Sequence, residues 1–155
     1  MPSTITIQTI VKAPIAKVWE CWNKPEHVIK WAFADDTWEA PAAENDLRAG
    51  GRFKITMAAK DKSASFDFTG TYTAVKEHEL IEYDMDRAPD EQVGRHVKVE
   101  FSAEGGSASG GGEAPDGVKI TEIFDPESKN PLEMQRKGWQ AILDNFKKYV
   151  ENFNN

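Results

Sequence analysis

Alternating apolar and polar residues fill the middle of the chain and predict a series of β-strands. Residues 4–12 form the first strand, and the two-residue period returns between Asp35 and Phe124. Its clearest apolar positions are Phe53-Ile55-Met57, Phe66-Phe68-Gly70-Tyr72, Ile81-Tyr83-Met85 and Val97-Val99-Phe101. A strand with this period turns one face to a core and the other to water, as the strands of antiparallel sheets do.

Helical spacing follows the first strand and returns at the end of the chain. Pro14 suits a first helical position, apolar residues recur every three or four positions up to Trp22, and a second short helix begins at Pro25. The last helix begins at Pro131, with Asn130 as its N-cap, and runs to about residue 153, a length of about 34 Å. Its apolar stripe comprises Leu132, Trp139, Ile142, Leu143, Phe146, Tyr149, Val150 and Phe153. This order of elements predicts an α+β helix-grip fold, one domain over residues 1–155, with a curved antiparallel sheet wrapped around the C-terminal helix.

Residues 105–117 are rich in glycine and separate the strand that ends near Phe101 from the strand that starts near Val118. The segment has no bulky apolar side chain to bury, so we expect a flexible hairpin loop. A phosphate-binding loop is the alternative. The segment lacks the Gly-x-x-x-x-Gly-Lys pattern of such loops, and the carboxylates of Glu113 and Asp116 would repel a phosphate.

Charge and composition narrow the classes of partner. The 155 residues carry a formal net charge of −7, which disfavours nucleic acid and anionic membrane surfaces. No apolar run approaches the roughly 20 residues that cross a bilayer, and the start lacks the features of a signal peptide, so we expect a cytoplasmic protein. Cys21 is the only cysteine and is expected to be a buried, inert thiol; the three histidines are scattered, so neither a metal site nor a cofactor is expected.

Four short motifs, in order along the chain, resemble one known superfamily. The resemblance is carried by Ala13-Pro14 with the tryptophans that follow, Arg48-Ala49-Gly50-Gly51-Arg52-Phe53, Gly70-Thr71-Tyr72, and Gly138-Trp139 with Ile142-Leu143. Together these residues are similar to the START/Bet-v-1-like (SRPBCC) superfamily, and within it to the group named after the activator of the heat-shock-protein-90 ATPase. The resemblance covers about residues 4–152 and implies a ligand cavity between the sheet and the long helix. The superfamily includes lipid and hormone carriers, polyketide cyclases and co-chaperone domains, so the resemblance implies no single activity.

The glycines of these motifs have physical roles in such a fold. Gly50 and Gly51 allow a positive φ in a tight turn or bulge. Gly70, in the middle of a strand, allows a sharp bend or the close approach of a helix. Gly138 is expected to let the last helix pack closely on the sheet, which would offset its cost of about 1 kcal/mol relative to alanine.

Aromatic side chains supply most candidates for a ligand site. Trp19, Trp22, Trp31 and Trp38 lie in or near the short helices. Ordinary core packing is one interpretation of this group, and placement of Trp31 and Trp38 at the cavity mouth is the other. The remaining apolar and aromatic candidates share inward positions on strands or on the last helix: Phe53, Phe68, Tyr72, Tyr83, Val99, Trp139, Leu143 and Phe146.

Glu122 is the main polar candidate. It shares strand parity with the apolar residue Phe124, and an inward carboxyl would have a raised pKa and could act as an acid, a base or an orienting acceptor. A bend near the strand end would instead leave Glu122 in water, because Ile123 offers the opposite parity. Tyr72 and Tyr83 either pack only or also orient a ligand through their hydroxyl groups.

Three classes of function remain open. The first is a binding protein that holds a small apolar or amphipathic molecule between the long helix and the sheet. The second is an enzyme of the cyclase or hydrolase type that would use Tyr72, Tyr83 and Glu122, although no pattern in the chain requires catalysis. The third is a module that interacts with a chaperone, another protein partner or a second copy of the chain. A chaperone activator of this group is expected to carry a preceding domain, for which this length leaves no room, so we favour the binding protein.

Overall fold

The computed structural model describes residues 4–34, 36–86, 95–104, 117–127 and 130–153. In chain order the elements are β1 (Ile5–Val11), α1 (Ile15–Asn23), α2 (Pro25–Val28), β2 (Trp38–Asn45), β3 (Arg52–Ala59), β4 (Ser65–Lys76), β5 (Leu80–Met85), β6 (Arg95–Glu104), β7 (Gly117–Phe124) and α3 (Leu132–Phe153). All strands join one antiparallel sheet in the order β1-β7-β6-β5-β4-β3-β2. The helix-grip α+β fold predicted from the sequence is confirmed.

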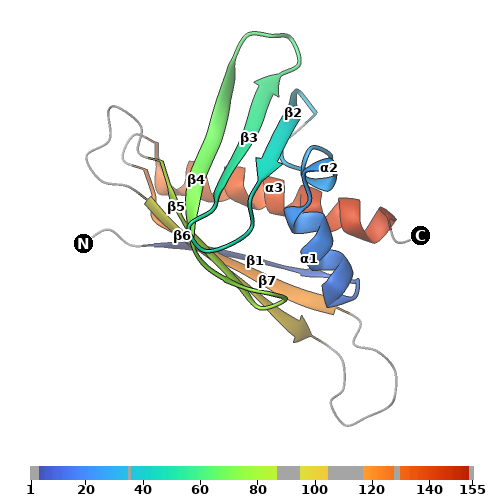
Figure 1. Ribbon diagram of the computed structural model, residues 1–155. Coiled ribbons are helices and arrows are strands. Elements are labelled where there is room, and N and C mark those ends of the chain that lie inside the picture. Colours follow the sequence, from blue (N-terminus) through green and yellow to red (C-terminus); the bar gives the residue numbers. More distant parts are fainter. Residues whose placement is uncertain (1–3, 35, 87–94, 105–116, 128–129, 154–155) are drawn as a thin grey trace, which may run out of the picture.

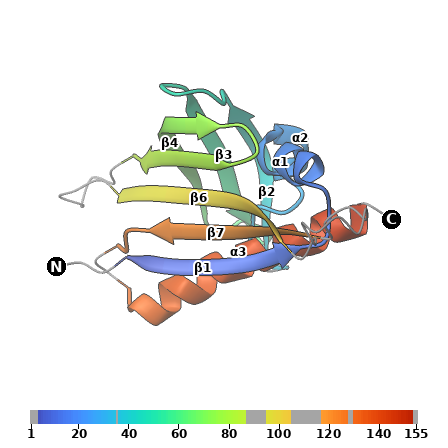
Figure 2. The ribbon, with the colours of Figure 1, turned by 90° about the horizontal axis from the view of Figure 1, so that it is seen from below.

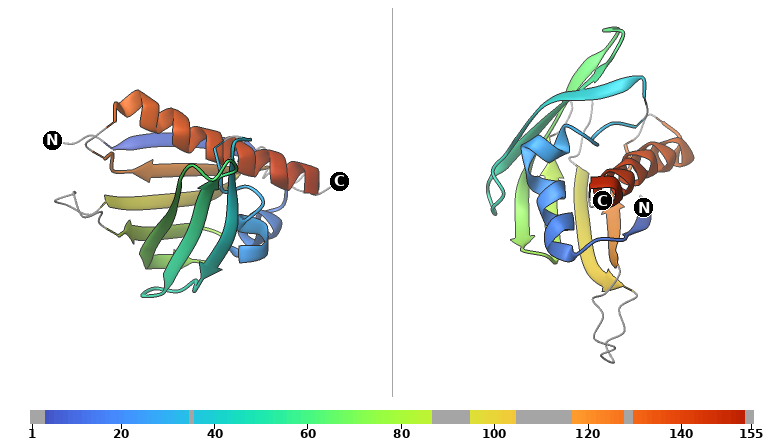
Figure 3. Two further views of the ribbon diagram at one scale, coloured as in Figure 1. Left: turned by 90° about the horizontal axis from the view of Figure 1, so that it is seen from above. Right: turned by 90° about the vertical axis from the view of Figure 1, so that its right-hand side faces the viewer.

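The sheet curls strongly, and α3 lies along its concave side (Figure 1). Seen from below, β1 and β7 run along α3, while β2, β3 and β4 rise away from that plane (Figure 2). Figure 3 shows β2, β3 and β4 curving over the helix, with α1 and α2 closing the end of the sheet near the C-terminus. Helices α1 and α2 therefore cover one end of the concave side of the sheet.

The turn before β3 and the middle of β4 depend on glycine. Gly50 has a φ of +86°, and a Cβ on Gly51 would stand 2.0 Å from the Asp46 main-chain oxygen. This turn also bonds the backbone of Tyr72, because Gly50 N–H donates to the Tyr72 oxygen (2.8 Å) and Tyr72 N–H to the Gly51 oxygen (2.9 Å). A Cβ on Gly70 would stand 2.7 Å from both the Asp84 main-chain oxygen and the Phe53 ring, so the close approach at Gly70 is that of the neighbouring strand and an aromatic ring and not of a helix.

Both edges of the sheet carry blocking features. At the β1 edge, Lys147 Nζ donates to the Ile10 main-chain oxygen (2.8 Å), and Gln140 Nε2 donates to that of Gln8 (3.2 Å). At the other edge, β2 contains Pro41, which has no N–H, beside a shift of register between Glu39 and Ala42. Side chains of α3 thus occupy one edge, and a proline with a bulge interrupts the other.

Apolar side chains pack closely where α1 and the segment after α2 meet the C-terminal half of α3. Phe146 is 0% exposed, and its ring centroid lies 4.9 Å from that of Trp22 and 4.7 Å from that of Trp31. Cys21 is buried nearby, and burial raises the pKa of its thiol to about 11. The thiol is therefore protonated at neutral pH, in agreement with the inert role expected for it.

The N-terminal half of α3 differs from the expectation. A Cβ on Gly138 would meet no atom within 4 Å outside its own helix, so the predicted close packing of helix on sheet at this glycine is wrong. Leu132 is 52% exposed, so the apolar stripe does not reach the sheet at its start.

The predicted hairpin loop 105–117 lies outside the described residues except for Gly117, the first residue of β7. None of the described helices is both long enough and apolar enough to span a membrane.

Candidate functional site

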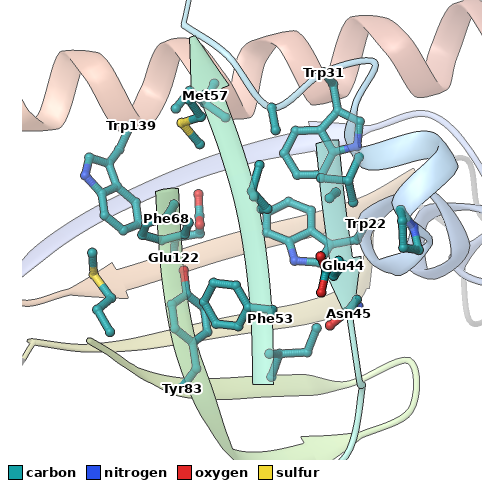
Figure 4. A pocket seen from close by; sticks show the side chains of 18 of the residues that line it. Trp22, Trp31, Glu44, Asn45, Phe53, Met57, Phe68, Tyr83, Glu122 and Trp139 are labelled. Atoms are coloured by element: carbon teal, nitrogen blue, oxygen red, sulfur yellow. The ribbon is translucent and has the colours of Figure 1, made fainter. Parts of the chain in front are cut away.

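A cavity of about 320 Å³ lies between α3 and the curled part of the sheet. Strands β3, β4 and β5 supply much of its wall, α1 and α2 close one end, and Trp139 of α3 stands at the other (Figure 4). Its volume is near the lower end of the roughly 300–1,000 Å³ that small-molecule sites occupy. Since most of the lining side chains are aliphatic or aromatic, the cavity suits a small apolar group.

Most of the candidate site residues line this cavity: Trp31, Phe53, Phe68, Tyr72, Tyr83, Glu122, Trp139 and Leu143. Trp38, Val99 and Phe146 do not. Trp38 is not among the residues that line the cavity, and its ring packs on Phe66, which does line it, with a centroid distance of 5.9 Å. Val99 and Phe146 are 0% exposed and belong to the filled core, because a strand or helix position that faces inward need not face the void.

Sequence reasoning missed several wall residues, among them Trp22, Ile55, Met57, Ile142, Glu44, Asn45, Arg95 and Glu127. Ile55 and Met57 share strand parity with Phe53, and Ile142 lies one helical turn after Trp139, so the pattern contained a signal for these three. Asn45 and Arg95 had no such signal. Each enters the wall through the curl of the sheet, which brings the ends of β2 and β6 to the cavity.

At the α1–α2 end of the cavity, the polar atoms are already bonded to the protein. Trp31 Nε1 donates to the Cys21 main-chain oxygen (2.9 Å), and Asn45 Nδ2 donates to that of Asn23 (2.7 Å). The Tyr72 hydroxyl donates to Asn45 Oδ1, and burial raises the Tyr72 pKa. These side chains therefore offer a ligand mainly ring faces and apolar edges.

At the opposite end, Glu122 points into the cavity. The residue is 6% exposed, and β7 places it between the buried residues Ile120 and Phe124 of the same parity. The inward orientation considered in the sequence is therefore the one adopted, and the solvated alternative is wrong. Burial raises the Glu122 pKa to about 8, because the ionised form loses its hydration.

Tyr83 of β5 directs its hydroxyl toward Glu122 (Figure 4). Burial, and then the nearby Glu122 charge, raise the Tyr83 pKa well above its ordinary value of 10. Among the described residues, neither Glu122 nor Tyr83 has a hydrogen bond to a protein side chain, yet no buried side-chain nitrogen or oxygen is left sealed without a partner. Both groups therefore reach the open space of the cavity, where a ligand or water can bond them.

The other charged groups of the wall are engaged or exposed. Arg95 donates from Nε to the Asp125 main-chain oxygen (3.1 Å). The Glu127 carboxylate accepts hydrogen bonds from Asn130, and Glu44 is exposed. No cluster of three or more histidine, cysteine, aspartate or glutamate residues suited to a metal ion occurs in the part of the chain that the structure describes.

Comparison with known proteins gives a consistent result. The sequence profile of the family described as "Activator of Hsp90 ATPase homolog 1-like protein" matches residues 12–151. An AHSA1-like protein from Aeromonas hydrophila has 38% identity and a TM-score of 0.81, covering 97% of this chain and 94% of its own. A protein from Cytophaga hutchinsonii has 48% identity and a TM-score of 0.73, covering 96% and 92%.

A more distant structure shares the fold alone. The protein from Chromobacterium violaceum has 21% identity and a TM-score of 0.77, and the match covers 97% of this chain and 99% of the other. No curated protein matches this chain.

Proposed function

Because this chain belongs to the family of Activator of Hsp90 ATPase homolog 1-like proteins, we propose that it binds a small apolar or amphipathic molecule between α3 and the sheet. One observation carries the proposal: an apolar cavity of about 320 Å³ with two polar groups at one end. Small-molecule sites are usually concave and mostly apolar, with a few placed polar groups, as this one is. The unfilled space costs the fold packing contacts that side chains could otherwise make. Binding sites commonly contain such a space.

The way the wall is built supports binding over simple imperfect packing. Gly70 leaves room for the Phe53 ring, which lies against Tyr83 with a centroid distance of 4.8 Å. The Gly50–Gly51 turn fixes the backbone of Tyr72. Wall residues that are held by their own neighbours form a preformed site, and a preformed site loses little conformational entropy when a ligand enters.

Titration with the neutral, environment-sensitive dye prodan tests this proposal. We expect saturable fluorescence enhancement with the native protein. Ile55→Trp should abolish it, because Ile55 lines the cavity and a larger ring would occupy the void. Ile123→Trp is the matched control, since Ile123 takes the opposite parity on β7 and does not line the cavity. The proposal fails if prodan does not bind, or if both variants bind it as the native protein does while remaining folded by circular dichroism.

An enzymatic role is the second candidate, and the placement of the Tyr83 hydroxyl near the Glu122 carboxyl favours it. A carboxyl with a pKa near 8 can exchange a proton at neutral pH, as general acids and bases must. The hydroxyl of Tyr72, the third residue of the expected set, already donates its hydrogen bond to Asn45, so it is less available to a substrate. Binding remains the simpler proposal, because it needs the cavity alone. The role of a chaperone partner, suggested by the family's name, has no specific feature of this cavity in its favour.

A further inference from the structure

The Glu122 carboxyl has no counter-charge in the described structure. It is 6% exposed, and burial is the cause of its raised pKa. Arg95 is the one basic residue among the described residues of the wall, and it forms no ion pair with Glu122. Most buried carboxylates in proteins are paired or hydrogen-bonded. This one has its open side toward the cavity.

Aromatic rings lie around the same position. Figure 4 shows Glu122, Phe68, Tyr83 and Trp139 at the same end of the cavity, with the Tyr83 hydroxyl toward Glu122. The Phe68 ring centroid is 6.1 Å from that of Tyr83 and 6.2 Å from that of Trp139. Ring faces carry negative electrostatic potential and attract cations, most strongly where water is excluded.

The charges of the cavity wall and of the whole chain also sum to a negative value. The wall includes three acidic residues, Glu44, Glu122 and Glu127, against the single basic Arg95, and the whole chain carries −7. A field of this sign attracts cationic ligands and repels anionic amphiphiles such as fatty-acid carboxylates.

We propose that the ligand of this cavity is an organic cation, an alkyl- or aryl-ammonium whose charged nitrogen lies beside Glu122 and whose apolar part extends toward Trp31. This inference rests on the binding function proposed above and names the chemical class of the ligand. The cation supplies the counter-charge that the carboxyl lacks, the rings of Phe68, Tyr83 and Trp139 add cation–π attraction, and the α1–α2 end offers apolar surface for the remainder of the molecule.

Two molecules of nearly the same shape test the charge separately from the cavity. Phenyltrimethylammonium and tert-butylbenzene differ in the replacement of a charged nitrogen by a carbon. Their affinities are measured at pH 8 by titration calorimetry or by changes in amide NMR shifts. We expect the ammonium compound to bind at least tenfold more tightly to the native protein.

Variants then assign the preference to one residue. Glu122→Gln should reduce the two affinities to within about twofold of each other while tert-butylbenzene still binds. Glu39→Gln, which removes the same charge from an exposed position on β2, should keep the native preference. Equal affinities in the native protein, or tighter binding of the hydrocarbon, overturn the inference and leave the binding function intact. Binding of neither molecule overturns both.

A second measurement needs no variant. A carboxyl with a pKa of about 8 is roughly ten times more ionised at pH 7 than at pH 6, so affinity for the permanent cation should rise about tenfold over that step. The other ionisable groups of the wall near Glu122 are Tyr72, Tyr83, Arg95 and Glu127; the lining residues of β3 and α3 contribute none. Both tyrosines have raised pKa values and do not ionise in this range. A flat profile for the ammonium, or an equal rise for tert-butylbenzene, contradicts the inference.

Discussion

The two ends of α3 carry the same kind of apolar stripe and lie in opposite surroundings. At the solid end, defined by Phe146 and Val150, both side chains are 0% exposed, and the Phe146 ring packs against Trp22 of α1 and against Trp31. At the hollow end, defined by Trp139 and Ile142, the side chains are half-buried and line the cavity. Among the elements that the structure describes, helices lie opposite the solid end and not the hollow end. The difference shows that the apolar stripe of a helix predicts which way a side chain points. It does not predict whether other side chains fill the space in front of it.

The largest expected effect separates the two ends by their stability. Phe146→Ala should lower the free energy of unfolding by about 3–5 kcal/mol, because it empties a filled site. Leu143→Ala should cost less than about 2 kcal/mol, because Leu143 already borders the void. Denaturant melts of both variants provide the measurement. Equal losses at the two positions would remove the distinction between solid and hollow ends.

A second prediction concerns the carboxyl of the hollow end in the absence of ligand. The Glu122 pKa is raised from 4.5 to about 8, so the folded protein keeps a proton that the unfolded chain has released. Stability therefore falls as pH rises through this window. Between pH 6 and pH 9 the native protein should lose about 3 kcal/mol relative to Glu122→Gln. Melts at both pH values measure the difference, with Glu39→Gln expected to follow the native protein; parallel curves for native protein and Glu122→Gln would mean that the carboxyl is hydrated.

The smallest effect tests the glycine of the hollow end. Gly138→Ala should raise the free energy of unfolding by up to about 1 kcal/mol, since the added methyl group meets open space and alanine favours the helix. Gly70→Ala is the contrasting variant and should destabilise by about 1–3 kcal/mol, because its methyl group would collide with the Asp84 main-chain oxygen and the Phe53 ring. Thermal melts decide both signs. A destabilised Gly138→Ala would restore the close helix packing expected from the sequence.

The sequence was sufficient to predict the fold because its signals are local. Period-two alternation located the strands from β3 to β7, and helical spacing located α3 to within about one residue of its observed start. The sequence left two orientations of Glu122 open, inward by strand parity or solvated through a bend, and the regular course of β7 decides for the inward one.

The site was predictable only in part, because the boundary between packed core and void depends on contacts between distant segments. Phe146 and Leu143 lie three residues apart on the same stripe, yet Phe146 faces Trp22 and Trp31 whereas Leu143 borders the cavity. Gly138 occupies a position where a close contact was physically reasonable, and the helix passes too far from other residues for one to form. Neither fact is encoded in spacing along the chain.

The blocked edges of the sheet bear on how the protein behaves at high concentration. An exposed edge strand is a template on which another chain can add a strand, and repeated addition leads to aggregation. Here Lys147 and Gln140 already bond the free oxygens of Ile10 and Gln8, and Pro41 breaks the row of donors on β2. Assembly with a second copy by strand addition is thereby disfavoured, and a curled, hollow sheet can remain open on its concave side without becoming a seed for fibres.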